Sequence, residues 1–219
     1  MSVHLQRAID QLKKDLLSLC ALVEEQVQTA VCALLETDEE MAREVEKRDL
    51  EIDQREVEVE EECLKTLALH QPVAADLRFL VAALKINNDL ERIGDLAVNI
   101  ARKAITFANL APMEIPFNLA GMWEKTHAML RDSLDALVNL DVPLANEVCV
   151  RDDEVDHLKR SIRLKAEEMI RKDPARCSSL LTLVAVSRNL ERIADHATNI
   201  AEDVIYMVEG RIIRHGDGE

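Results

Sequence analysis

The stretch Leu90-Glu-Arg-Ile-Gly-Asp-Leu-Ala-Val-Asn-Ile-Ala101 recurs one hundred residues later as Leu190-Glu-Arg-Ile-Ala-Asp-His-Ala-Thr-Asn-Ile-Ala201, with nine of the twelve positions identical. An earlier block recurs as well. At an offset of 103 residues, eight positions from Asp38 to Asp53 carry the same residues as the positions from Asp141 to Asp156. Two long matches in the same order indicate that the chain contains an internal duplication of one structural unit.

Each unit has the apolar spacing of long helices. In the first helix the apolar residues step by three and four, which keeps them on one face: Leu5, Ile9, Leu12, Leu16, Leu19 and Val23. Helix breaks are predicted at Thr37-Asp38, at Gln71-Pro72, where Pro72 suits a helix start, at Asp141 to Pro143 and at Asp173-Pro174. The helices are expected to end near residues 36, 70, 108, 139, 171 and 209, the last at Gly210.

The segment from Asn109 to Phe117 contains Pro112 and Pro116 and has no periodicity, so it is the predicted linker. Aromatic content of 2% and only five glycines argue against sheets and hairpins. We therefore expect an all-α fold of two tandem antiparallel three-helix bundles, the first over residues 1–110 and the second over residues 111–219.

Composition excludes several classes of protein. A net charge of −15 disfavours nucleic acid as a partner and would repel free phosphate. No run approaches the ~20 apolar residues that cross a bilayer, and the start lacks a signal-peptide pattern, so a cytoplasmic protein without membrane insertion is expected. Five widely spaced cysteines contain no Cys-x-x-Cys pair, which indicates reduced, mostly buried thiols.

Acidic residues repeat at i, i+4 spacing, which places two carboxylates on one helix face, about 6 Å apart at Cβ. Because 42 of the 219 residues are acidic, one such pair is more often a solvated face than a site. The repeat singles out two sets of four, here called the first quartet (Asp49, Asp53, Glu91 and Asp95) and the second quartet (Asp152, Asp156, Glu191 and Asp195).

Hairpin register gives a stronger test. The numbers of Asp49 and Asp95 average 72, as do those of Asp53 and Glu91, which is the predicted turn. In the second quartet the residue numbers of Asp152 and Asp195, and those of Asp156 and Glu191, both average 173.5, which lies between Asp173 and Pro174. Each quartet is therefore expected to lie level across its hairpin, and the helical periodicity places it on the bundle surface beside a groove, outside the core.

Four adjacent carboxylates repel one another, and three remedies exist: raised pKa values, arginine partners or a bound cation. Arginines that could neutralise the quartets are Arg48, Arg92, Arg151 and Arg192. All-oxygen ligation would suit Mg²⁺, Mn²⁺ or Ca²⁺, and carboxylate-bridged iron is feasible. Spacing alone leaves salt-bridge networks and metal binding both open.

The residues resemble the PhoU family. The resemblance rests on Gln71-Pro-Val-Ala-Ala-Asp-Leu-Arg78, on Asn88-Asp-Leu-Glu-Arg-Ile-Gly-Asp95 and on Asn189-Leu-Glu-Arg-Ile-Ala-Asp195, and it covers essentially the whole chain. It implies tandem three-helix bundles and self-association as a homodimer or higher homo-oligomer. It also implies a negative regulator of the phosphate-starvation response, an adaptor between the phosphate ABC transporter and a sensor histidine kinase with no catalytic step.

The resemblance further implies metal ions at the acidic pairs, with iron, zinc, manganese or magnesium as candidates. Carried over residue by residue, the ligands are the eight acids Asp49, Asp53, Glu91, Asp95, Asp152, Asp156, Glu191 and Asp195. His196 replaces Leu96 of the first unit, so the second site could gain a nitrogen ligand, although such a histidine is more often a surface residue.

Two other classes of function stay open. Di-iron helical enzymes use Glu-x-x-His, a spacing found at Glu124 with His127 and at Glu154 with His157, but the first unit has no counterpart. The third alternative is a purely structural bundle whose acids serve solubility. No glycine-rich phosphate loop, nucleophile elbow or His-Glu-x-x-His motif is present.

Overall fold

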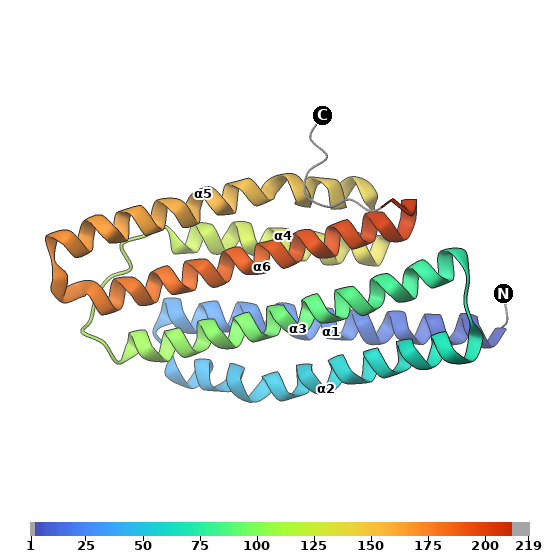
Figure 1. Ribbon diagram of the computed structural model, residues 1–219. Coiled ribbons are helices and arrows are strands. Elements are labelled where there is room, and N and C mark those ends of the chain that lie inside the picture. The colour runs from blue at the N-terminus through green and yellow to red at the C-terminus, as the bar shows by residue number, and fades with distance from the viewer. Residues whose placement is uncertain (1–2, 212–219) are drawn as a thin grey trace.

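The computed structural model describes residues 3–211, and long α-helices make up nearly all of that range (Figure 1). The elements are α1 (Val3–Glu36), α2 (Glu39–His70), α3 (Ala74–Ala108), α4 (Leu119–Asn139), α5 (Val142–Lys172), the 3₁₀ turn η1 (Pro174–Arg176) and α6 (Cys177–Glu209). The prediction of an all-α fold with two tandem three-helix units is confirmed.

Local capping explains where several helices begin and end. The Asp38 carboxylate accepts hydrogen bonds from the backbone N–H groups of Glu40 and Met41, and so starts α2. Asp141 caps α5 in the same way through Leu144 N–H. Gly210 has a φ of 71° and ends α6 with a bond from its N–H to the Tyr206 carbonyl, because glycine adopts the left-handed conformation without steric cost.

The two proline turns differ from the prediction in detail. Pro72 is buried and lies within the turn, and α3 begins two residues later at Ala74. Gln71 and Ala74 have positive φ values of 44° and 51°. Pro174 begins the short 3₁₀ turn that leads into α6. Both prolines thus mark a reversal, but only Pro174 opens a helical element.

The two units lie against each other along their lengths (Figure 1). In the picture α3 and α6 occupy the middle, with α2 and α5 on opposite outer sides, and the contact between α3 and α6 is extensive. Buried apolar side chains of both units form one continuous cluster. The predicted division near residue 110 falls in the connection between α3 and α4, and the assignment of residues 1–110 and 111–219 to two domains stays a prediction.

Polar contacts also join the halves. Lys85 of α3 pairs with Asp203 of α6, which is largely buried. His196 Nδ1 of α6 lies 2.7 Å from Asp89 Oδ1 of α3. Because buried polar groups are costly unless they are paired, these two contacts favour the observed alignment of α3 with α6, in addition to apolar packing.

Helix α1 is long and apolar enough to cross a membrane by length and composition, although polar residues interrupt its apolar sequence. Half of its most apolar window is buried inside the protein. The helix contacts α2, α3 and α4, so its apolar face is accounted for as core. The absence of membrane insertion stays a prediction.

Candidate functional site

The structure gathers each quartet at a helix hairpin, as the register predicted. In the first quartet, Asp49 and Asp53 lie on α2, and Glu91 and Asp95 lie on α3. Burial, and then repulsion from Asp53 and Asp95, raises the pKa of Asp49, so the carboxylates of the two helices are close enough to repel one another. None of the eight quartet acids is fully buried, in agreement with a surface position.

Gly94 allows α2 and α3 to approach closely beside the first quartet. A Cβ atom at this position would lie 3.3 Å from Ile52 Cγ2 and 3.6 Å from Asp49 Oδ1. The first distance is shorter than an ordinary van der Waals contact. Because glycine has no Cβ, α3 can lie this close to the face of α2 that carries Asp49 and Ile52. The second unit has Ala194 at the equivalent position.

Burial is the main cause that raises the pKa of Asp49 and of Glu91, followed for Glu91 by repulsion from Asp95. Opposing this, buried Gln26 of α1 donates a 2.8 Å hydrogen bond from Nε2 to Asp49 Oδ1. Glu91 Oε2 is buried without a hydrogen bond in the described part of the chain, although Arg92 Nε lies 3.3 Å away. The first quartet therefore keeps much of its repulsion.

The four arginines proposed as neutralising partners behave differently from one another. Arg48 pairs with Glu25 and Glu44, outside the quartet. Arg151 similarly pairs with acids outside the second quartet. Arg92 contacts Glu91 and, at 3.5 Å, Asp95. Within residues 3–211, Arg92 is the one member of this set that forms ion pairs with a quartet.

A lysine that the sequence reasoning missed occupies the second quartet. Lys159 Nζ donates to Asp156 Oδ1 at 2.8 Å and to Glu191 Oε1, and so joins α5 to α6. The hydrogen bond from Lys159 lowers the pKa of Asp156. Asp195 forms no ion pair within residues 3–211, and partial burial, then repulsion from Glu191 and Asp152, raises its pKa to about 6.

The two quartets are therefore chemically unequal. At the 103-residue offset Lys159 corresponds to Glu56, so the first unit carries a fifth acid where the second carries a cation. Burial and repulsion from neighbouring acids raise the pKa of Glu56. Gln26 likewise corresponds to Met129, whose thioether has no hydrogen to donate to a carboxylate. Extending the repeat alignment by three residues beyond Asp53 would have revealed the Glu56 and Lys159 difference.

The chemistry of the first quartet fits a hard cation, because its donors are all carboxylate oxygens and Glu91 Oε2 is an unsatisfied acceptor. In the described range, no three acidic, histidine or cysteine side chains are already arranged to hold an ion. The carboxylates would have to rotate toward a shared cation. The eight acids stay predicted ligands.

His196, considered as an extra ligand of the second site, is engaged elsewhere. Its Nδ1 lies 2.7 Å from Asp89 Oδ1, and Asn199 Nδ2 is 3.3 Å from the same oxygen. The imidazole thus belongs to the contact between α6 and α3. One ring nitrogen is unavailable for a metal in this arrangement.

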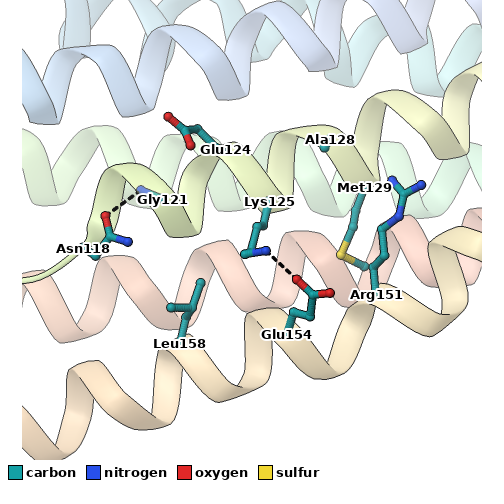
Figure 2. Close-up of a pocket in the computed structure, with 9 residues that line it drawn as sticks. All are labelled: Asn118, Gly121, Glu124, Lys125, Ala128, Met129, Arg151, Glu154 and Leu158. Atoms are coloured by element: carbon teal, nitrogen blue, oxygen red, sulfur yellow. Dashed lines mark hydrogen bonds and ion pairs between the residues drawn. The ribbon is translucent and has the colours of Figure 1, made fainter.

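The Glu-x-x-His motifs do not converge into a di-iron site. Figure 2 shows the groove between α4 and α5, where Glu154 is paired with Lys125 and Glu124 lies away from it. His127 stacks on Trp123 and has its Nε2 3.2 Å from Glu24 Oε1 of α1. These side chains are held by different neighbours, so the geometry does not support the di-iron alternative.

Comparison with known proteins identifies the relatives of this chain. The PhoU domain family model matches residues 16–104 and 119–204, one match in each unit. A Pseudomonas putida protein named phosphate-specific transport system accessory protein PhoU homolog is 37% identical over 98% of this chain and 84% of its own length. An Aquifex aeolicus protein of the same name is 38% identical over 97% of this chain and 96% of its own length.

Solved structures agree with the sequence relatives. The crystal structure of PhoU from Pseudomonas aeruginosa has a TM-score of 0.90 and 36% sequence identity, covering 94% of this chain and 99% of that chain. The phosphate transport system regulatory protein PhoU from Streptococcus pneumoniae has a TM-score of 0.89 and 27% identity, over 96% and 100% of the two chains. The resemblance inferred from the motifs is confirmed.

Proposed function

This chain belongs to the PhoU family, and we propose that it is an accessory protein of a phosphate-specific transport system that represses phosphate uptake when phosphate is plentiful. The observation that carries this is the match of the PhoU domain to both halves, with relatives aligned over nearly the whole chain. Membership of a family of accessory proteins confirms the expectation of a protein with no catalytic step. The regulatory direction is our proposal.

The proposed partners are the phosphate ABC transporter and a sensor histidine kinase, between which the chain acts as a cytoplasmic adaptor. Long exposed helices give it a large surface for such contacts, with apolar side chains standing out on α2 at Leu50, Val57 and Leu64. A helical bundle without a catalytic centre transmits its signal by binding. Self-association into a homodimer or higher oligomer is part of this proposal.

A genetic test addresses the regulatory role. Deletion of the gene should raise phosphate uptake and phosphate-scavenging enzyme activity in cells grown with abundant phosphate, because the repressing contact is lost. Reintroduction of the intact gene should restore repression. Normal repression in the deletion strain, measured as phosphate uptake rate, would rule out the proposed role.

We further propose that a divalent cation holds the first quartet together and thereby sets the charge of this surface. Support comes from repulsion that Gln26 and Arg92 relieve only in part: burial and neighbouring acids raise the pKa of Asp49 and Glu91, and Glu91 Oε2 has no hydrogen bond in residues 3–211. A cation among these oxygens would replace that repulsion with attraction. The second quartet already contains Lys159 and should bind metal more weakly.

Thermal unfolding with added Mn²⁺ or Fe²⁺ tests the metal site. The intact chain should gain several degrees in Tm, because a ligand that binds only the folded state stabilises it. The combined substitution Asp53→Asn with Glu91→Gln should abolish this gain. Glu58→Gln with Glu61→Gln, which removes two exposed acids of α2 outside the quartet, should leave it intact. A gain that survives in the quartet variant would refute the site.

The alternative of a purely structural scaffold makes the opposite prediction. The protein should then show no metal-dependent change in stability, and phosphate regulation should be normal without it. The metal and genetic experiments are independent, so an accessory protein that binds no metal would appear as regulation without a Tm gain.

A further inference from the structure

A basic hollow of about 690 Å³ lies between α5 and α6, although the protein as a whole has a net charge of −15. Two acids of the second quartet, Glu191 and Asp195, line one part of it, but cations outnumber them. The five cationic side chains that line it are Lys159, Arg160, Arg163, Arg188 and Arg192. They come from both helices, so the hollow has cations on its two sides. Such a concentration of positive charge on an acidic protein is not explained by solubility.

Three of these five cations form no ion pair with another described residue, although the charge of Arg160 helps to lower the pKa of Asp156 after the hydrogen bond from Lys159. Lys159 is engaged by Asp156 and Glu191, and Arg163 has a long 3.8 Å contact with Glu167. The guanidinium groups of Arg160, Arg188 and Arg192 form no ion pair within residues 3–211. Exposed arginines on such an acidic surface would ordinarily find carboxylates. These three instead border an open space.

The repeat shows that the hollow is special to the second unit. Lys159, Arg160 and Arg163 correspond to Glu56, Val57 and Glu60 at the 103-residue offset. Arg188 corresponds to Asn88 at the offset of 100, and only Arg192 has a cationic counterpart, Arg92. The common fold therefore does not require these cations.

We propose that the hollow binds an anion that carries a chain of two or more phosphate groups. Guanidinium groups match phosphate oxygens with paired hydrogen bonds, and groups on both helices suit more than one phosphate. The volume falls within the ~300–1,000 Å³ of small-molecule sites. No aromatic side chain lines the hollow to stack a base, so the phosphates supply the recognition.

Titration calorimetry on the full chain, in low salt with a chelator present, tests this with inorganic tripolyphosphate as the probe. One molecule should bind per chain, and orthophosphate should bind at least tenfold more weakly because it reaches fewer arginines. A parallel titration with ATP distinguishes the sources: equal affinity indicates that the free phosphate chain is sufficient, and tighter binding of ATP indicates a nucleoside phosphate. Absence of saturable binding of both would overturn the proposal.

The combined variant Arg160→Gln with Arg188→Gln should weaken binding of tripolyphosphate at least tenfold, whereas Arg160→Lys with Arg188→Lys should retain most of it. Arg171→Gln with Lys172→Gln is the matched control, since these exposed cations of α5 do not line the hollow, and it should bind as the intact chain does. Equal losses in the control and in the hollow variant would indicate nonspecific charge attraction and overturn the proposal.

Binding to vesicles that contain phosphatidylserine tests whether the hollow instead binds a membrane surface. Both Arg160 and Arg188 are exposed, so their variants should fold, which far-UV circular dichroism verifies. Vesicle binding that depends on these arginines, without binding of tripolyphosphate or ATP, would assign the hollow to a membrane surface and reject the small-anion site.

Discussion

Lys159 of α5 donates a hydrogen bond to Glu191 of α6 and thereby places a cation inside the second set of four acids. The equivalent position of the first unit is Glu56, which adds an acid to an already acidic set. The two hairpins have nearly the same arrangement of helices, and this one difference in sequence gives their acidic sets different charge. The internal ammonium and a bound metal are alternative ways to offset the same repulsion.

Substitution Lys159→Gln should raise the affinity of the second quartet for Mn²⁺ at least tenfold, because it removes the ammonium that competes for Asp156 and Glu191. The reciprocal change Glu56→Lys should weaken Mn²⁺ binding at the first quartet. Calorimetric titration of each variant measures both effects. Lys125→Gln, which breaks an exposed pair with Glu154 elsewhere, is the control and should change neither affinity.

The pH dependence of stability should carry the signature of Asp195. Its pKa of about 6 in the folded protein lies above the unfolded value of about 3.9, so the folded state binds more protons between these limits. Stability contributed by this group is therefore present at low pH and lost as pH rises through 6. Asp195→Asn should remove that loss and stabilise the metal-free protein at pH 7 by about 1 kcal/mol, discounted for solvent screening.

Asp156→Asn is the matched control, and it should change the stability at pH 7 in the opposite direction. The hydrogen bond from Lys159 lowers the pKa of Asp156, so its contribution is present at neutral pH and is lost as pH falls through the lowered pKa. The variant should be less stable than the intact chain at pH 7. Urea unfolding at pH 5 and pH 7 measures both variants, and a stabilising Asp156→Asn would contradict the role given to Lys159.

Gly94→Val should destabilise the protein by about 1–3 kcal/mol, because its side chain would be forced against Ile52 across the contact of α2 with α3. Gly94→Ala should be much milder, since the gain in helix propensity of about 1 kcal/mol offsets a contact of 3.3 Å at Ile52 Cγ2. Chemical unfolding gives both values. Ala194→Gly in the second unit is the control and should cost about 1 kcal/mol through propensity.

Lys85→Met should cost about 1–3 kcal/mol, because it takes the cation from the largely buried carboxylate of Asp203. Lys125→Met breaks an exposed pair and should cost less than about 1 kcal/mol. Urea unfolding with a helical signal measures both. Equal effects would show that the contact between α3 and α6 does not depend on this pair.

Much of the fold could be predicted because its determinants are local. Apolar spacing at three and four residues, Asp38 and Asp141 as caps, and Gly210 as a stop all act within a few residues of chain. The duplication and the hairpin register then placed the acids at matching heights. The predicted start of α3 at Pro72 is two residues too early. The residues with left-handed backbone there, Gln71 and Ala74, are not glycines, so the sequence does not indicate this conformation.

The sequence by itself determined the helices, the repeat and the two acidic quartets, since these follow from periodicity and from the symmetry of a hairpin about its turn. Only the tertiary structure decided which cation faces which acid. Lys159 is near Glu191, and Lys85 near Asp203, through packing of helices distant in sequence. Long, flexible lysine and arginine side chains pair with the carboxylates nearest to them in space. The spacing of residues along one helix does not predict which carboxylates of another helix these are.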